Sequence, residues 1–183
     1  MKLVPGEQIT FENMLYGLLL ASGNDAAVAI AYNSPGGIDG FVDEMNKKTA
    51  ELNLVNTYFA DPTGLSSEDY TTALDLSRLA SFALKNETLT GIFATRQKTV
   101  TDVTGSFVHP LENLNKLLGS VVGAAGVKTG YTEEAGQVLV AAAIREGHTI
   151  VTVVLKSQDR FLDSKNLLEW AFTNHRFTPP TLL

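Results

Sequence analysis

Cysteine is absent from the 183-residue chain, and histidine is scarce. Without a thiol the chain can form no disulfide framework, no thiolate nucleophile and no cysteine-ligated zinc or iron–sulfur site. The three histidines, His109, His148 and His175, are scattered and form no HxH or HExxH pair. We interpret them as surface or turn residues, and the sequence predicts no metal site.

Basic residues are outnumbered by acidic ones, 14 to 20, which gives a net charge of −6 at pH 7. No block of basic residues is present, so the electrostatic footprint of a nucleic-acid-binding protein is missing. The longest apolar stretch near the start, Met14 to Ala21, is too short to span a bilayer, and no secretion signal precedes it. With 44% apolar and 19% charged residues, the composition is that of one globular domain.

Helical spacing of apolar residues dominates the first half of the chain. Thr10 is a candidate N-cap for a helix from Phe11 to Leu20, and Asp25 is a candidate cap for a second helix from Ala26 to Tyr32. The stretch from Ser22 to Asn24 should form a tight loop between these helices. Two further amphipathic helices are predicted, over residues 38–52 and 72–84.

Alternating β-branched residues mark the second half of the chain. Residues 98–108 should form a hairpin with its turn at Thr104 and Gly105. A final helix is expected over residues 161–171, where Trp170 is interpreted as core packing against a sheet. Two apolar strands should pair antiparallel, over residues 137–144 and 149–156.

Two short motifs stand out, Ser22-Gly23-Asn24 and Lys128-Thr129-Gly130. Each occurs by chance in unrelated proteins. Taken alone, Ser22 is interpreted as a loop residue, Asn24 as a helix cap and Lys128 as a solvated strand lysine. Their context favours function, because the first motif closes a loop between two apolar helices and the second opens a β region.

Longer strings around these motifs carry a specific resemblance. They are Leu19–Ala27, Pro62–Leu65, Tyr70–Leu76, Asn113–Leu118 and Gly126–Thr132. Over roughly residues 5 to 172, the sequence resembles the serine-type D-alanyl-D-alanine carboxypeptidases of the low-molecular-weight penicillin-binding protein family.

The resemblance implies a fold of the α+β class, an α/β/α sandwich of the penicillin-binding or β-lactamase-like transpeptidase type, in an incomplete form. One partial penicillin-binding domain would occupy residues 1–183. It would consist of a helical lobe over about residues 10–90 and an antiparallel sheet flanked by helices over about residues 91–175.

The resemblance also implies a function. In this family a serine attacks the peptide bond between the last two D-alanines of a peptidoglycan stem peptide, and water then releases the shortened stem from the acyl-enzyme. β-Lactams mimic that peptide and trap the acyl-enzyme. Such a hydrolase needs no cofactor, does not bind nucleic acid and works outside the cytoplasmic membrane, in the periplasm or at the cell wall. The resemblance does not indicate whether a membrane anchor is present.

Three residues would be catalytic by this resemblance. Ser22 would shuttle a proton toward the leaving nitrogen, and Asn24 would hold a substrate amide carbonyl. Lys128 would supply positive potential for the terminal carboxylate of the substrate and a hydrogen bond to Ser22.

Three further residues would bind the substrate. Thr129 would contact the terminal carboxylate through its hydroxyl, and Gly130 would let the substrate backbone lie against the strand. The backbone N–H of Tyr131 would be one oxyanion-hole donor. Leu114 is a departure, because some relatives carry at this place an arginine that grips the carboxylate.

A larger departure concerns the nucleophile. The acylated serine of the family lies in a Ser-x-x-Lys motif ahead of the Ser-x-Asn loop, and the 183 residues contain no such tetrapeptide. We therefore expect an N-terminally truncated chain that is inactive alone. The alternative is a non-catalytic remnant or binding module of the same fold. A Ser-x-x-Lys upstream in the full gene would decide for the enzyme.

The strand over residues 149–156 has its own consequence. In relatives, the first strand of the sheet comes from the N-terminal segment and lies beside this last strand, so a truncated chain would leave the edge uncovered. The strand is β-branched, nearly uncharged and free of proline, which favours pairing with another chain. A dimer through residues 149–156 is therefore expected.

Overall fold

The computed structural model describes residues 1–178, which contain six helices and five strands. The helices are α1 (Phe11–Leu20), α2 (Asn24–Tyr32), α3 (Gly37–Glu51), α4 (Ala73–Ala83), α5 (Glu87–Ala94) and α6 (Arg160–Asn174). The strands are β1 (Gln97–Thr101), β2 (Val108–Glu112), β3 (Ala124–Thr132), β4 (Gly136–Arg145) and β5 (His148–Ser157). The predicted elements are thus present, with their ends shifted by a few residues.

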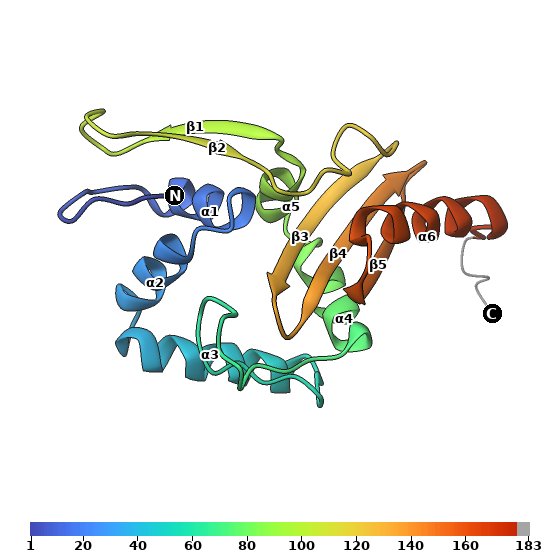
Figure 1. Cartoon of the computed structure of the whole chain (residues 1–183), viewed down its shortest axis with the longest axis horizontal. Coiled ribbons are helices and arrows are strands. Elements are labelled where there is room, and N and C mark those ends of the chain that lie inside the picture. The colour runs from blue at the N-terminus through green and yellow to red at the C-terminus, as the bar shows by residue number, and fades with distance from the viewer. Residues whose placement is uncertain (179–183) are drawn as a thin grey trace.

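Three antiparallel strands form the main sheet in the order β3-β4-β5, and β1 and β2 form a separate hairpin. Helices α4 and α5 pack on one face of the main sheet and α6 packs on the other. Figure 1 shows α1, α2 and α3 to one side of this sheet and α6 on the opposite side. The predicted α/β/α sandwich is therefore confirmed.

Strand β4 is the centre of the core because it is buried on both faces. Leu139 and Ala141 belong to a core cluster with Leu168 of α6. Val140 and Ala142 point the other way, into a cluster built with α4 and α5. A strand covered on both faces needs an unbroken apolar run rather than polar alternation, and the sequence of β4 supplies it.

Side chains at the helix starts fix several boundaries. Thr10 caps α1 by accepting the N–H of Asn13, as predicted, and Thr72 caps α4 in the same way. The predicted cap at Asp25 is wrong. Helix α2 begins at Asn24, so Asp25 lies inside its first turn.

Helix α5 was not predicted from the sequence. Its eight residues include a glycine and two threonines, which have low helix propensity. Asn86 caps it by accepting the N–H of Leu89 at 3.0 Å. The buried side chains of Ile92 and Phe93 then hold the helix against the rest of the protein, so tertiary packing overrides propensity here.

Two side chains lie elsewhere than predicted. His109 is only 6% exposed, because it pairs with a buried carboxylate on Glu7 instead of facing solvent. Trp170 is exposed on α6 and contacts His175 edge to face, whereas Phe172 packs against the core. The apolar spacing of the last helix did not distinguish its buried face from its exposed one.

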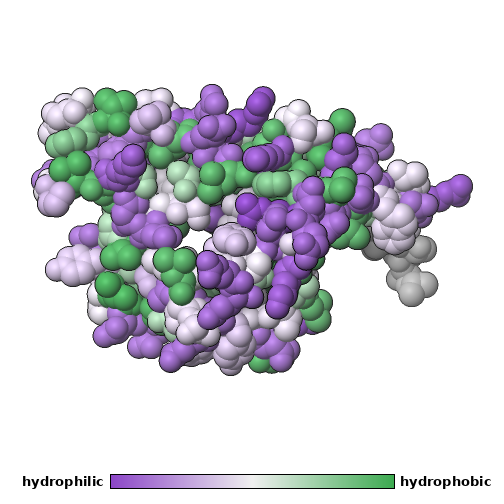
Figure 2. Space-filling view, viewed as in Figure 1, coloured by the Kyte–Doolittle hydropathy of each residue, from purple (hydrophilic) through white to green (hydrophobic). Residues whose placement is uncertain are grey.

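Hydrophilic and hydrophobic side chains are interspersed over the face of the molecule drawn in Figure 2. Within residues 1–178, no helix combines the length and the apolar character that crossing a bilayer requires. In the same residues, no group of three or more histidine, aspartate or glutamate side chains is arranged to hold a metal ion.

Candidate active site

The two motifs meet in space. Lys128 on β3 donates a hydrogen bond from Nζ to Ser22 Oγ at 2.8 Å, although 106 residues separate them in the sequence. The same ammonium donates to the carbonyl oxygen of Thr129 at 2.9 Å. This contact ties the loop between α1 and α2 to strand β3.

The loop that presents Ser22 is tight. Ser22 adopts a left-handed backbone conformation with φ of 52°, which is uncommon for a residue other than glycine. Next to it, the N–H of Gly23 donates to the carbonyl of Gly17 at 3.1 Å. A Cβ at Gly23 would lie 3.1 Å from the same oxygen, which explains the glycine in this motif. Strained backbone of this kind clusters at functional sites.

Asp25 anchors the same loop from the start of α2. Its Oδ1 accepts from the N–H of Ala26 at 2.9 Å and from the ammonium of Met1 at 2.8 Å. Its Oδ2 accepts from the N–H of Leu3 at 2.8 Å. Burial opposes ionisation of the carboxyl, but these hydrogen bonds outweigh it and lower the pKa of Asp25 to about 2. The carboxylate therefore remains charged around neutral pH.

Lys128 occupies an unusual electrostatic environment for a lysine. Burial lowers its pKa from 10.5 to about 8, and the positive charge of Arg160 adds to this effect. An ammonium with such a pKa is mostly protonated at pH 7 and can still exchange a proton near neutrality.

Arg160 is a residue of this site that the sequence motifs did not identify. It is the first residue of α6, and its Nη1 donates to the carbonyl oxygen of Gly130 at 2.6 Å. Among residues 1–178, neither Lys128 nor Arg160 forms an ion pair with a carboxylate. One sequence feature could have indicated Arg160. A cation in the first turn of a helix interacts unfavourably with the helix dipole, so an arginine at this place suggests a role other than stabilising the helix.

Strand β3 gives the site an open edge. It lies at one end of the main sheet, so the backbone groups on its outer side have no partner strand among the described residues. Thr129 is buried, whereas Tyr131 is exposed at the end of the strand. Two cations and free backbone donors along one strand edge can bind the carboxylate end of an extended peptide.

Asn24 stands apart from the contact between Lys128 and Ser22. It is exposed, and no hydrogen bond of its side chain occurs within residues 1–178. It lines an apolar groove of about 560 Å³ together with Leu3, Val28 and other residues of α2 and the N-terminal segment. The structure therefore brings Ser22 and Lys128 together but leaves Asn24 without a described partner.

Leu114 lies close to the loop that carries Ser22. Its N–H donates to the carbonyl of Leu20 at 3.1 Å, so the loop after β2 lies beside the Ser22 loop. The exposed Leu114 side chain offers no charge there. Arg160 supplies a cation from a different element, at the carbonyl of Gly130.

Comparison with known proteins gives a consistent family. The sequence profile of the D-alanyl-D-alanine carboxypeptidases matches residues 1–159. The D-alanyl-D-alanine carboxypeptidase DacF of Bacillus subtilis is 38% identical over 97% of this chain and 46% of its own length. A D-alanyl-D-alanine carboxypeptidase of Streptomyces sp. strain K15 is 36% identical, over 93% of this chain and 63% of its own length. The chain thus spans about half the length of the curated relatives that it matches.

Comparison with solved structures gives the same family. The crystal structure of the Streptomyces K15 DD-transpeptidase aligns with a TM-score of 0.88 at 35% identity, covering 94% of this chain and 71% of that one. A penicillin-binding protein homologue from Mycobacterium tuberculosis aligns with a TM-score of 0.84 at 31% identity, covering 95% of this chain and 68% of that one. On its sequence profile, its relatives and its fold, the chain belongs to the D-alanyl-D-alanine carboxypeptidase family.

Proposed function

We propose that this chain supplies the Ser-x-Asn and Lys-Thr-Gly side of the active site of a serine-type D-Ala-D-Ala carboxypeptidase. The substrate is the stem peptide of peptidoglycan, and β-lactams bind at the same place as mimics of that peptide. The observation that most supports this is the 2.8 Å hydrogen bond between Lys128 Nζ and Ser22 Oγ. Two motifs present by chance would have no reason to bring their polar side chains into contact.

The terminal carboxylate of the substrate is the group that the site recognises. Lys128 and Arg160 provide two positive charges without a carboxylate partner in residues 1–178, and charge-assisted hydrogen bonds are about twice as strong as neutral ones. We assign the hydroxyl of Thr129, the next residue of β3 after Lys128, as a further donor to this carboxylate. A peptide that ends in an amide rather than a carboxylate would forfeit these interactions.

The open edge of β3 holds the peptide backbone. An extended peptide can add to this edge as a further strand, and Gly130 has no side chain to prevent its approach. The N–H of Tyr131 then points at the developing oxyanion, where one such donor is typically worth about 3 kcal/mol at the transition state. Asn24 holds an amide carbonyl of the substrate through its side-chain amide.

Ser22 carries the proton to the leaving nitrogen. Because Lys128 donates to Ser22 Oγ, the hydroxyl hydrogen of Ser22 is free to point toward the leaving group. Lys128, with a pKa of about 8, can return a proton to Ser22 afterwards.

The nucleophile must come from a Ser-x-x-Lys segment, and the 183 residues contain none. We therefore infer that this chain forms no acyl-enzyme by itself. The test is incubation with a fluorescent penicillin, followed by intact mass measurement. It compares the chain with a fusion that places the Ser-x-x-Lys segment of the Bacillus subtilis relative before Met1. The fusion should be labelled on the added serine, and labelling of the chain alone would contradict the proposal.

The family acts on the cell wall, which implies an extracytoplasmic location in general. We propose that the protein works in the periplasm or on the outer face of the cytoplasmic membrane. We further propose that two copies associate through strand β5. Among the described residues β5 pairs only with β4, and its free edge is β-branched and nearly uncharged.

A further inference from the structure

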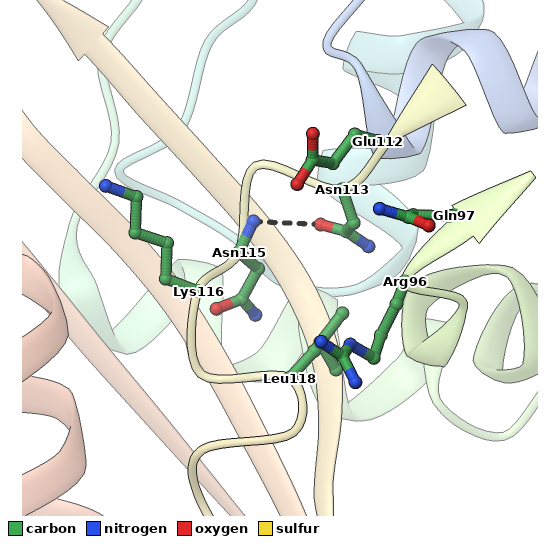
Figure 3. Close-up of a pocket in the computed structure, with 7 residues that line it drawn as sticks. All are labelled: Arg96, Gln97, Glu112, Asn113, Asn115, Lys116 and Leu118. Carbon is green, nitrogen blue, oxygen red and sulfur yellow. Dashed lines mark hydrogen bonds between the residues drawn. The ribbon is translucent and has the colours of Figure 1, made fainter. Parts of the chain in front are cut away.

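A polar cavity lies where the β1–β2 hairpin meets the loop that follows it. Its volume is about 240 Å³, and it contains none of the residues assigned above to the active site. Figure 3 shows side chains from the start of β1, the end of β2 and the following loop around it. Three of these matter for its chemistry, namely Arg96, Glu112 and Asn115.

Asn115 is the buried part of this cavity. It is 2% exposed, and its Oδ1 accepts the N–H of Leu117 at 3.1 Å. Its Nδ2 is also buried and has no hydrogen-bond partner among the described residues. In Figure 3 this nitrogen lies on the side of Asn115 that is turned toward Arg96. A buried donor without an acceptor is rare in folded proteins and calls for an acceptor from outside the chain.

Arg96 provides a second set of donors. Its guanidinium lies against Gly119, where an added Cβ would be 3.0 Å from Cζ and from Nη1. No hydrogen bond or ion pair of its side chain occurs within residues 1–178. Lys116 does not compete for the same anion, because Figure 3 shows its ammonium pointing away from the cavity, and that ammonium lies 5.8 Å from the Phe161 ring centroid.

Glu112 places an opposite charge on the same cavity. Its carboxylate and the Arg96 guanidinium both line the cavity, yet they form no ion pair with each other. The cavity thus keeps a cationic side, formed by Arg96 and Asn115, apart from an anionic side formed by Glu112. A ligand that satisfies both sides must itself carry a carboxylate at one end and an ammonium at the other.

We propose that this cavity binds a small amino acid as its zwitterion. The ligand carboxylate accepts from Arg96 and from Asn115 Nδ2, and the ligand ammonium faces Glu112. D-Alanine is the natural probe because the proposed function releases it, and this naming rests on that function. The charge pattern of the cavity does not depend on it.

The test is a titration of the ¹⁵N-labelled 183-residue chain with D-alanine, followed by NMR at the Asn115 side-chain amide and Arg96 Nε. Saturable shifts at both are expected. Acetate has no ammonium group, and in N-acetyl-D-alanine an uncharged amide replaces the ammonium. Each should therefore bind about tenfold more weakly than D-alanine. Equal binding of acetate or of N-acetyl-D-alanine would overturn the zwitterion assignment.

Two substitutions complete the test. Asn115→Asp keeps the acceptor for the Leu117 N–H but replaces the free donor with an acceptor, and Arg96→Gln removes an exposed charge. Each should weaken D-alanine binding by about tenfold or more, whereas Lys85→Gln, the same charge change at an exposed site elsewhere, should not. Absence of saturable binding, or unchanged binding in Arg96→Gln, would overturn the proposal. Because binding needs no acylation, a fusion that penicillin fails to label would contradict the proposed function and leave this site standing.

Discussion

Lys128 holds a positive charge in a partly buried position, where burial lowers its pKa to about 8. Unfolding restores the ordinary value of 10.5, so between these values the unfolded chain binds more protons and stability rises with pH. We predict that Lys128→Met is more stable than the parent at pH 7 by roughly 1–3 kcal/mol, and that the difference shrinks by about pH 10. Urea unfolding at the two pH values measures this. Lys85→Met is the control at an exposed lysine, and a difference equal at both pH values would contradict the account.

His109 and Glu7 form a buried pair whose side chains are 6% and 1% exposed. His109 Nε2 lies 2.6 Å from Glu7 Oε1, and its Nδ1 lies 3.1 Å from the carbonyl of Met1, which can only accept. We predict that His109→Leu lowers the free energy of unfolding by about 1–3 kcal/mol, because it leaves Glu7 Oε1 buried without its hydrogen-bond partner, while Oε2 keeps the N–H of Val4.

The control for this pair is the double variant Glu7→Leu/His109→Leu, which removes both polar groups. It should recover much of the lost stability in urea unfolding, because two apolar side chains can replace a buried hydrogen-bonded pair at little cost. A double variant no more stable than His109→Leu alone would show that the pair is not what holds the N-terminal segment to β2.

Strand β5 has one free edge among the described residues. If two copies pair through this edge, a charged side chain introduced on β5 should weaken their association. A lysine at Val153 would disturb the core, because Val153 packs against it. The substitution for the test is therefore Leu155→Lys, at an exposed position of the strand. We predict that the parent chain forms dimers or larger species in light scattering and that Leu155→Lys shifts it toward the monomer. Leu74→Lys, at an exposed leucine of α4, should leave association unchanged. A parent chain that is monomeric at all concentrations would contradict the prediction.

Elements with strong periodicity were predictable, and those held by tertiary contacts were not. Helix α1 has the predicted bounds, because Thr10 caps it and its apolar residues repeat along one face. Strands β4 and β5 were predictable from apolar β-branched runs. Helix α5 was missed because its propensity is poor and its stability comes from the burial of Ile92 and Phe93. Local sequence does not contain that information.

At the scale of the whole molecule, the two motifs predicted the contact between Ser22 and Lys128 but not every residue around it. A second Ser-x-Asn, Ser164-Lys165-Asn166, lies within α6 with its serine fully buried, so the tripeptide alone would have misled. Its partner motif and the loop context singled out Ser22. Arg160 escaped prediction because only the packing of α6 against the sheet brings it to Gly130. Distance in sequence conceals such contacts.

The contact between Lys128 and Ser22 is the central feature of the proposed active site. Its most direct test is the rate of acylation by a fluorescent penicillin in the fusion that carries a Ser-x-x-Lys segment, with and without Lys128→Ala. We predict that the variant is acylated at least about 100-fold more slowly, because the lost charge acts mainly on the transition state. Its folding, followed by circular dichroism, should be unchanged. Acylation rates that agree within a few-fold would contradict the assignment of this site.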